Sequence, residues 1–448
     1  MSSPPHPLAR TERSARALSV RRYRPGDELA IQRMYETVFG PGRSMDAWRW
    51  RFLDVPGSTV IFLLEAGPTV VGHLGFAGFP AWIDGEPGAV ALGGDLMVLP
   101  EYRRRGGAEQ LVEALPSLDS GFDVRLGFPR DAAVRVHARS AASRFLGRLP
   151  RWVRWYGRDS RLPAAAQLGP LLRLHGRYAS CPQPRLPIEP LVELGAEVDA
   201  LAAESAAFAR CIRVRDAAYL RWRWVSQPDR QWMLRAARDP DGSLRGLVVF
   251  GGRELPEGRR GRIVDLLARD AGAMRALVCD AAEELERQGC VNVVLDYRDP
   301  RPWSRTALYR AGFLPVGRGL NVTARWLSDP GRAGTERLAD WYLTLGDTDL
   351  ALEPYVVPAS FFASEGLGTS RCCANQRSPR RPSLANATPG TGCPDTRRRR
   401  ARACAGSSPR VRRARHRLLA ANGELRERRD QLTHPPRQLD DLEAAVGG

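Results

Sequence analysis

The pattern of apolar and polar positions predicts a mixed α/β protein in which one order of elements occurs twice. Residues 60–65 (VIFLLE) read as an apolar strand, residues 65–68 as a turn and residues 70–76 as a second strand. Gly and Pro at the turn favour a hairpin. The same order returns later in the chain, at residues 231–236, 239–242 and 244–250.

A third strand, a helical stretch and a further strand follow each hairpin. The third strand contains Asp95-Leu-Met97 in the first copy and Asp265-Leu-Leu267 in the second. Each copy is therefore an α/β unit of ordinary domain size. The predicted organisation is a leader (1–17), a first domain (18–160), a connector (161–189), a second domain (190–350) and a tail (351–448).

An aromatic–arginine block stands near the start of each copy. Arg49-Trp50-Arg51 matches Arg221-Trp222-Arg223, and a proline follows at the same distance in both. Aromatic side chains recur at a spacing of two in this block, which favours a strand or turn that packs its rings into the core. The alternative is that the block forms a wall of a substrate cleft.

Residues 96–111 (LMVLPEYRRRGGAEQL) read as a strand, a turn and the start of a helix. Pro100 ends the strand because it has no N–H, and Gly106 with Gly107 allows a sharp turn. The free N–H groups at a helix start, with the positive end of its dipole, bind phosphate well. Arg103, Arg104 and Arg105 add positive charge, so the segment predicts a pyrophosphate-binding loop.

This segment resembles a motif of the GNAT superfamily of acyl-CoA N-acyltransferases. Arg103, Gly106 and Ala108 fit its Q/R-x-x-G-x-G/A pattern. The resemblance implies acetyl-CoA as co-substrate, with Leu96, Met97 and Val98 offering backbone groups to the pantetheine. It also implies that the pyrophosphate lies on the loop formed by Arg103, Arg104, Arg105, Gly106, Gly107 and Ala108.

The second copy lacks this loop. Residues 269–274 carry no arginine triplet, and Asp270 places negative charge where a phosphate would lie. The copy does keep Tyr309, in a helix that resembles one in GNAT domains whose tyrosine often protonates the leaving thiolate. Ala141 stands at the matching place of the first copy. We therefore expect two tandem GNAT-like domains, the second of them degenerate.

The implied reaction transfers an acyl group from acyl-CoA to an amine, of a small molecule or of a protein. Positioning of amine and thioester supplies most of the catalysis, together with a base and an acid. The candidates for these roles are Asp95, His73 and His137, besides Tyr309, and each has a structural role as its alternative. The alternative for the whole protein is acyl-CoA binding or regulation without transfer.

Composition adds little chemistry. The formal charge is +18, all basic residues are Arg, and about half of the excess lies in the tail. This Arg/Pro-rich tail is expected to be disordered; it either binds nucleic acid non-specifically or is a frame-shifted translation. The eight Cys show no zinc-site spacing, so we expect no metal. No apolar run is long enough to span a membrane, and a cytoplasmic location is expected.

Overall fold

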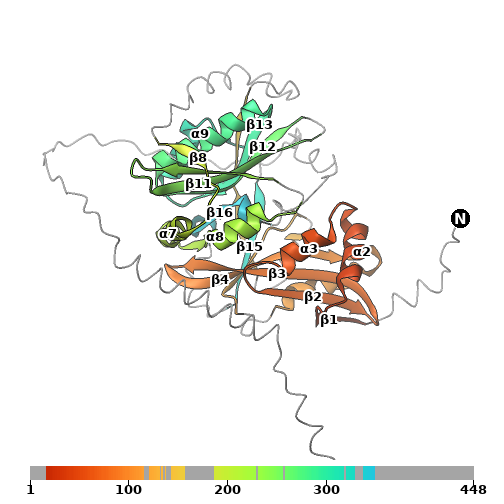
Figure 1. The fold of residues 1–448 in the computed structure, drawn as a ribbon. Helices are drawn as coiled ribbons and strands as arrows, with labels where there is room; N and C mark the ends of the chain where they lie inside the picture. The colour runs from red at the N-terminus through yellow and green to blue at the C-terminus, as the bar shows by residue number, and fades with distance from the viewer. Residues whose placement is uncertain are drawn as a thin grey trace, which may run out of the picture.

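The protein has a mixed α/β fold, as predicted, and in the described part of the chain sixteen strands join into one branched sheet. The computed structural model describes residues 17–115, 121–131, 133–134, 137, 143–156, 186–228, 231–255, 258–316, 319–327 and 337–348. We call residues 17–156 the first half and residues 186–348 the second half. Figure 1 shows the first half in red and orange and the second mainly in green. Nearly all of the predicted leader, most of the connector and the whole tail lie outside the described residues.

The sheet of the first half is an antiparallel meander extended by one parallel strand. The β2–β3 hairpin lies where the apolar pattern predicts it, and β3 turns into β4 through Asp84 and Gly85. Both turn residues have positive φ, 54° and 81°, as two-residue hairpin turns of the Asp-Gly type require. The strands are β1 (Leu18–Arg22), β2 (Thr59–Ala66), β3 (Thr69–Ile83), β4 (Glu86–Val98) and β5 (Val124–Gly127), with β5 parallel to β4.

Three helices pack on this sheet: α2 (Glu28–Phe39), α3 (Met45–Phe52) and α4 (Gly107–Glu113). Ile31, Met34 and Tyr35 recur at helical spacing on α2 and are buried in one cluster with residues of β2 and β4. Ser44 caps α3 by accepting a hydrogen bond from the N–H of Ala47 at 3.0 Å. The prediction of a strand or turn for the aromatic block is therefore wrong, because the Ser cap and i, i+4 packing of the rings favour a helix.

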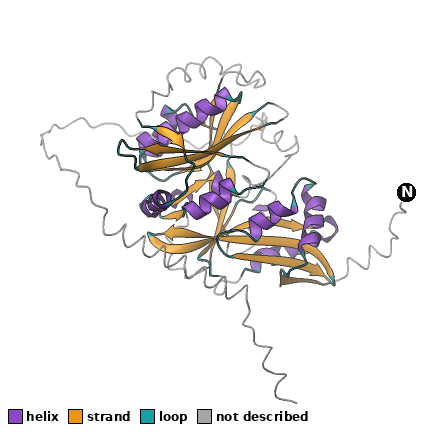
Figure 2. Ribbon diagram, viewed as in Figure 1, coloured by secondary structure: helices purple, strands orange, loops and turns teal. Residues whose placement is uncertain are grey.

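The second half repeats this order of elements. Its aromatic block is also helical, as α8 continues directly into the π-helical turn η3. Figure 2 shows helices lying against the sheets in both halves. The elements are β8 (Ile188–Pro190), α7 (Ala196–Glu204), α8 (Ala217–Leu220), η3 (Arg221–Val225), β10 (Met233–Arg238), β11 (Leu244–Arg253), β12 (Arg260–Ala268), α9 (Ala271–Arg287), β13 (Asn292–Arg298) and α10 (Trp303–Arg310).

The two halves exchange strands. After β6 (Arg144–Leu149), the strand β7 (Arg151–Trp155) leaves the first sheet and pairs with β13 and β14 (Leu314–Pro315). In return β15 (Leu320–Trp326) pairs with β5 and β6 of the first half. The polypeptide therefore crosses between the two sheets in both directions.

Two short strands connect the sheets. Strand β9 (Cys211–Arg213) pairs with β3 of the first half, and β16 (Trp341–Thr344) pairs with both β9 and β13. Figure 1 shows β16 between the sheets of the two halves. One apolar core extends across both halves, from Leu92 and Leu126 to Leu266. Among the described helices, none is long and apolar enough to cross a membrane.

Candidate functional site

The first site feature is a β-bulge at Asp95. Phe76 pairs with Gly93 and Gly72 pairs with Val98, so five steps along β4 oppose four steps along β3. The extra residue is accommodated where Asp95 takes a left-handed backbone, with φ 55°. A bulge of this kind bends the strand and redirects its backbone groups.

Strand β4 continues beyond its last pair with β5. Their pairs run from Val90–Val124 to Leu92–Leu126, whereas β4 continues to Val98. The bulge lies in this continuing part, where β4 has no pairing with β5. We call this diverging part of the two strands the first fork. Leu96, Met97 and Val98 are the strand residues beside it.

The loop after β4 has the geometry of an anion-binding turn. Arg104 and Gly106 have positive φ, 62° and 77°. Alternating left- and right-handed residues turn successive N–H groups toward one side of a loop. Gly106 is the N-cap of α4, whose first N–H groups have no carbonyl within the helix to bond.

The three arginines of the loop do not behave alike. Arg103 turns back toward the strand, where its Nε donates to the carbonyl oxygen of Val98 at 3.0 Å. The guanidinium of Arg105 lies 5.6 Å from the ring centre of Tyr102, within the range of a cation–π contact. Arg104 is exposed. Arg103 therefore shapes the loop, and Arg104 is free to reach solvent anions.

Close packing under the loop requires a glycine. A Cβ on Gly107 would lie 2.4 Å from Cδ2 of Leu64 and 3.3 Å from Cδ1 of Leu18. The backbone at the start of α4 therefore packs directly on the side chains of Leu64 and Leu18, on β2 and β1. Ala108 follows and is half-buried, so only small residues stand at the helix start.

Asp95 is buried and lies between two arginines. Arg43 pairs with Oδ2, and Arg51 donates to Oδ1 at 2.7 Å. Burial raises the pKa of Asp95, but the charges of Arg51 and Arg43 together hold it below its usual range. A carboxylate with a lowered pKa and two cationic partners is a weak proton acceptor. This arrangement favours a structural role at the bulge over the predicted role as base.

Gly94 makes room for this ion pair. A Cβ on Gly94 would lie 1.9 Å from a guanidinium nitrogen of Arg51, so only glycine lets that side chain cross the strand. Arg43 was not singled out from the sequence, and Arg51 was named only as part of the aromatic–arginine block, not as a partner of Asp95. They lie 52 and 44 positions before Asp95, so local pattern could not pair them. The repeat did contain a signal, since Arg43, Arg51 and Asp95 correspond to Arg215, Arg223 and Asp265.

His73 is fully buried beneath the bulge. Its Nδ1 lies 3.0 Å from the carbonyl oxygen of Asp95, which places the proton on Nδ1. Nε2 has no hydrogen-bond partner among the described residues. Burial lowers the pKa of His73 to about 4, so the ring is neutral near pH 7. The geometry gives His73 a direct contact with the backbone of the bulge.

His137 and Tyr309 lie apart from the bulge contacts. His137 faces the end of β5, where its Cε1 would be 3.9 Å from a Cβ on Gly127, and burial lowers its pKa to about 4. Tyr309 lies on α10 and is 37% exposed, and its ring packs edge-on against Trp152 at 5.3 Å. Among the described residues, no hydrogen bond or ring contact joins Tyr309 to the loop or bulge of the first half.

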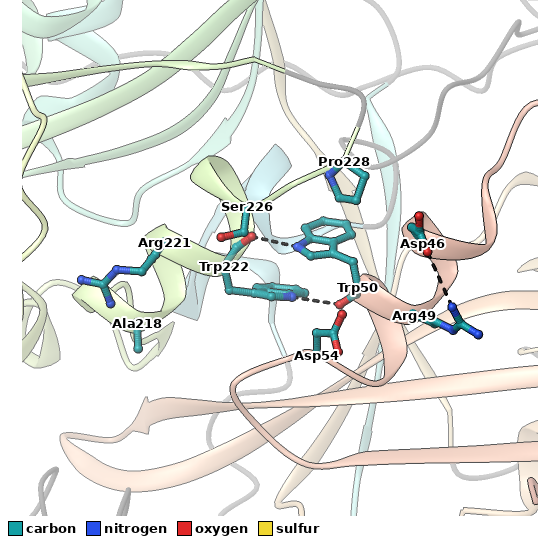
Figure 3. Close-up of a pocket in the computed structure, with 9 residues that line it drawn as sticks. All are labelled: Asp46, Arg49, Trp50, Asp54, Ala218, Arg221, Trp222, Ser226 and Pro228. Atoms are coloured by element: carbon teal, nitrogen blue, oxygen red, sulfur yellow. Dashed lines mark hydrogen bonds and ion pairs between the residues drawn. The ribbon is translucent and has the colours of Figure 1, made fainter. Parts of the chain in front are cut away.

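A groove of about 490 Å³ opens between α3 and the α8–η3 segment. Trp50 and Trp222 stack at its base with ring centres 5.0 Å apart (Figure 3). Each indole N–H donates to the other residue's carbonyl oxygen at 2.9 Å. The lining residues are Asp46, Arg49, Trp50, Asp54, Ala218, Arg221, Trp222, Ser226 and Pro228. The aromatic block therefore fills part of the core and also forms one wall of a groove.

The groove and the first fork are separated by a thin layer of side chains. Trp222 lies 5.4 Å from Phe79 on β3, centre to centre. Phe79 in turn lines a small enclosed cavity with Leu92 and Leu126, the last paired residues of the fork. Within the described residues, no group of three or more His, Cys, Asp or Glu side chains could hold a metal ion.

Comparison with known proteins confirms the predicted resemblance for the first half. Residues 29–145 match the Acetyltransferase (GNAT) family, a range that includes the bulge, the loop and α4. No match was found among curated proteins.

One solved structure with this fold and two further similar structures have low sequence identity to this chain. A GCN5-related N-acetyltransferase from Anabaena variabilis is 14% identical, with a TM-score of 0.53 over 72% of this chain and 75% of that one. A probable N-acyltransferase from Enterococcus faecalis is 11% identical, with a TM-score of 0.49 over 69% and 73%. A GCN5-related N-acetyltransferase from Kribbella flavida is 17% identical, with a TM-score of 0.47 over 72% and 74%.

Proposed function

We propose that this chain, whose residues 29–145 match the GNAT acetyltransferase family, transfers an acyl group from acyl-CoA to an amine. The observation that carries the proposal is the succession of bulge, first fork and loop at one end of β4. The bulge at Asp95 exposes a strand edge, and nine and eleven residues later Arg104 and Gly106 form an anion-binding turn.

The residues present fit acyl-CoA. Backbone groups of Leu96, Met97 and Val98 would hold the pantetheine, which can extend the sheet as a strand does. N–H groups of the loop and of the start of α4 would hold the pyrophosphate, with Arg104 supplying charge. Gly107 lets α4 come close enough to β2 for both sets of groups to face one ligand.

The chain's own groups would act mainly by position and polarity. Bound acyl-CoA supplies the activated thioester. N–H groups at the bulge would polarise its carbonyl, and their orientation is fixed in advance because the Arg43–Asp95–Arg51 cluster and His73 hold the bulge. Positioning of the amine beside the thioester lowers the barrier further. The fully buried His73 and ion-paired Asp95 support the site rather than exchange protons with solvent.

We propose that the acceptor amine enters through the groove over Trp50 and Trp222. Asp46 and Asp54 line it, and carboxylates suit an ammonium group. Replacement of the exposed Asp54 by Asn should raise KM for a cationic amine severalfold and leave kcat unchanged. Asp84→Asn, an exposed acid at the β3–β4 turn, is the matched control. Equal KM values for both variants would place the acceptor elsewhere.

Calorimetry with acetyl-CoA tests the central proposal. The full chain should bind it, and the double variant Arg104→Glu/Gly106→Asp should weaken binding at least tenfold. Arg305→Glu, an exposed arginine on α10, is the charge control and should bind normally. No binding by the unaltered chain would refute the proposal.

Release of free thiol across a panel of amines then separates transfer from mere binding. Binding without thiol release on any amine would favour a regulatory acyl-CoA-binding protein. The ion pairing of Asp95 and the burial of His73 support this regulatory alternative.

A further inference from the structure

The second half also has a bulge and a fork, with the extra residue at Val264, next to Asp265. Phe250 pairs with Ile263 and Gly246 pairs with Ala268, so again five steps on one strand oppose four on the other. The parallel pairing of β12 with β13 ends at Ile263–Leu295, while β12 continues to Ala268. We call this diverging part the second fork. Leu266 corresponds there to Leu96.

A segment of the chain itself lies in the second fork. Strand β16 pairs with the end of β13 through Tyr297–Thr344 and Arg298–Leu343, on the side where β12 diverges. The short 3-10 helix η6 (Leu345–Asp347) follows and contacts both β12 and β13. Tyr342 and Thr344 are fully buried. Residues 341–348 thus fill the space between the two strands.

Residues 341–348 form hydrogen bonds with backbone and side-chain groups of the second bulge. The hydroxyl of Tyr342 donates to the carbonyl oxygen of Leu266, and the N–H of Leu266 donates to Oδ1 of Asp265 at 3.1 Å. Thr344 donates to the same carboxylate oxygen at 2.9 Å. Both backbone groups of the residue equivalent to Leu96 therefore have protein partners.

A buried ion-pair cluster fixes the segment. Arg215, fully buried, pairs with Asp265 at 2.7 Å and with Asp347 at 2.5 Å. Arg213 pairs with the other oxygen of Asp347 at 2.9 Å. Arg215 and Asp265 correspond to Arg43 and Asp95 of the first half, and Asp347 is a second acid brought in by the inserted segment.

At the end of the second fork where a phosphate would bind, the backbone N–H groups also have hydrogen-bond partners within the protein. Asp270 accepts from the N–H groups of Gly272 and Ala273 at 2.8 and 3.1 Å, at the start of α9. Its carboxylate therefore takes the place that an anion would have, as its sequence position predicts. Arg301, which follows β13, donates to the carbonyl oxygen of Arg269, which follows β12, at 3.3 Å. This bond joins the two loops between which a cofactor would pass.

We infer that residues 341–348, with Asp270 and Arg301, act as an internal ligand that occupies the second fork, so that each chain binds one acyl-CoA, in the first half. The statement about stoichiometry rests on the proposed function, whereas the occupancy of the second fork does not. Because β16 also pairs with β9, which pairs with β3, the same segment joins the sheets of the two halves. The second half thus contributes the Trp222 wall of the groove rather than a second cofactor site.

Amide hydrogen exchange of the full chain, measured without and with CoA, tests the occupancy directly. Peptides covering 263–268, 293–298 and 341–347 should exchange slowly without CoA and should not change when it is added. Peptides covering 95–109 should become protected on addition of CoA. Rapid exchange of 341–347 without CoA, or CoA-dependent protection of 263–272, would overturn the inference.

Calorimetry supplies the stoichiometry. One CoA per chain is expected, and the Arg104→Glu/Gly106→Asp variant should retain no second site. Two sites per chain, or a site in the variant that binds CoA as tightly as the unaltered chain does, would overturn the inference. If the chain binds no CoA but 341–347 are protected, the proposed function fails while the occupancy of the second fork is supported.

A pair of isosteric variants tests the polar contacts. Thr344→Val removes the hydroxyl that bonds Asp265 and should lower Tm by about 3–6 °C, because a buried carboxylate loses a partner. Thr37→Val removes an exposed hydroxyl on α2 and should change Tm by less than about 1 °C. Equal effects of the two variants would count against the internal ligand.

Discussion

Trp50 and Trp222 form a reciprocal pair in which each indole N–H donates to the backbone carbonyl of the other residue, at 2.9 Å in both directions. The two residues occupy equivalent positions in the repeat, and their rings stack at 20°. The contact therefore relates the two halves by an approximate two-fold symmetry and buries the ends of both aromatic blocks.

Loss of either N–H should weaken the junction between the halves. Trp50→Phe leaves the carbonyl of Trp222 buried without its donor, which costs about 1–3 kcal/mol of unfolding free energy. Trp48→Phe is the control on the same helix, since the Nε1 of Trp48 has no hydrogen-bond partner among the described residues. Urea unfolding should show a smaller loss for Trp48→Phe, and equal losses would show that the reciprocal bonds contribute nothing.

Removal of Asp95 should destabilise the fold more than an acid–base role would predict. Asp95→Ala leaves Arg43 and Arg51 buried without their counter-charge, at a cost of about 3–5 kcal/mol. Asp46→Ala removes only an exposed ion pair with Arg49, worth less than about 1 kcal/mol. If Asp95→Ala kept full stability and lost only kcat, Asp95 would be the base after all.

Stability should fall as the pH is lowered from about 6.5 to about 4. Burial lowers the pKa of both His73 and His137 to about 4 from an ordinary value of 6.5. The unfolded chain therefore binds more protons in this window, and the folded state loses stability as pH falls. For the fully buried His73 the loss is at most on the order of 3 kcal/mol.

The variant His73→Gln isolates this contribution. Its unfolding free energy should change less between pH 6.5 and 4 than that of the unaltered chain. Denaturant unfolding at several pH values measures the difference. A pH dependence equal to that of the unaltered chain would mean that His73 is accessible to protons in the folded state.

Two glycine variants should separate the shape of the loop from its charge. Gly106→Ala strains a residue with φ 77°, a cost of about 1–2 kcal/mol. Gly107→Ala places a methyl group 2.4 Å from Leu64 and pushes α4 outward. Neither changes a charge, yet both should weaken acetyl-CoA binding about tenfold in calorimetry. The control Gly242→Ala has a similar φ of 84° in the second half and should leave binding unaltered.

Local pattern predicted the parts of the fold that depend on near neighbours. Hairpin turns, the strand before Pro100 and the helix start at Gly107 all follow from residues a few positions apart. The aromatic blocks were misread because a spacing of two describes only three residues, whereas the Ser44 cap and the packing of Trp48 with Phe52 four positions later define a helix.

The long-range parts of the site could not be read in this way. Nothing near β16 indicates that Tyr342 bonds Leu266, 76 positions earlier. The partners of Asp95 are similarly distant. Comparison of the two copies could have found them, because both retain an arginine at the position of Arg43 and an acid at the bulge.

The exchange of β7 and β15 has a consequence for synthesis on the ribosome. Strand β15, at residues 320–326, pairs with β5 and β6 of the first half. The amino-terminal portion of a nascent chain therefore has an exposed strand edge until more than 320 residues have been made. Because unpaired edges promote aggregation, folding should depend on chaperone protection during that interval. Expression of either half alone should for the same reason yield an insoluble product.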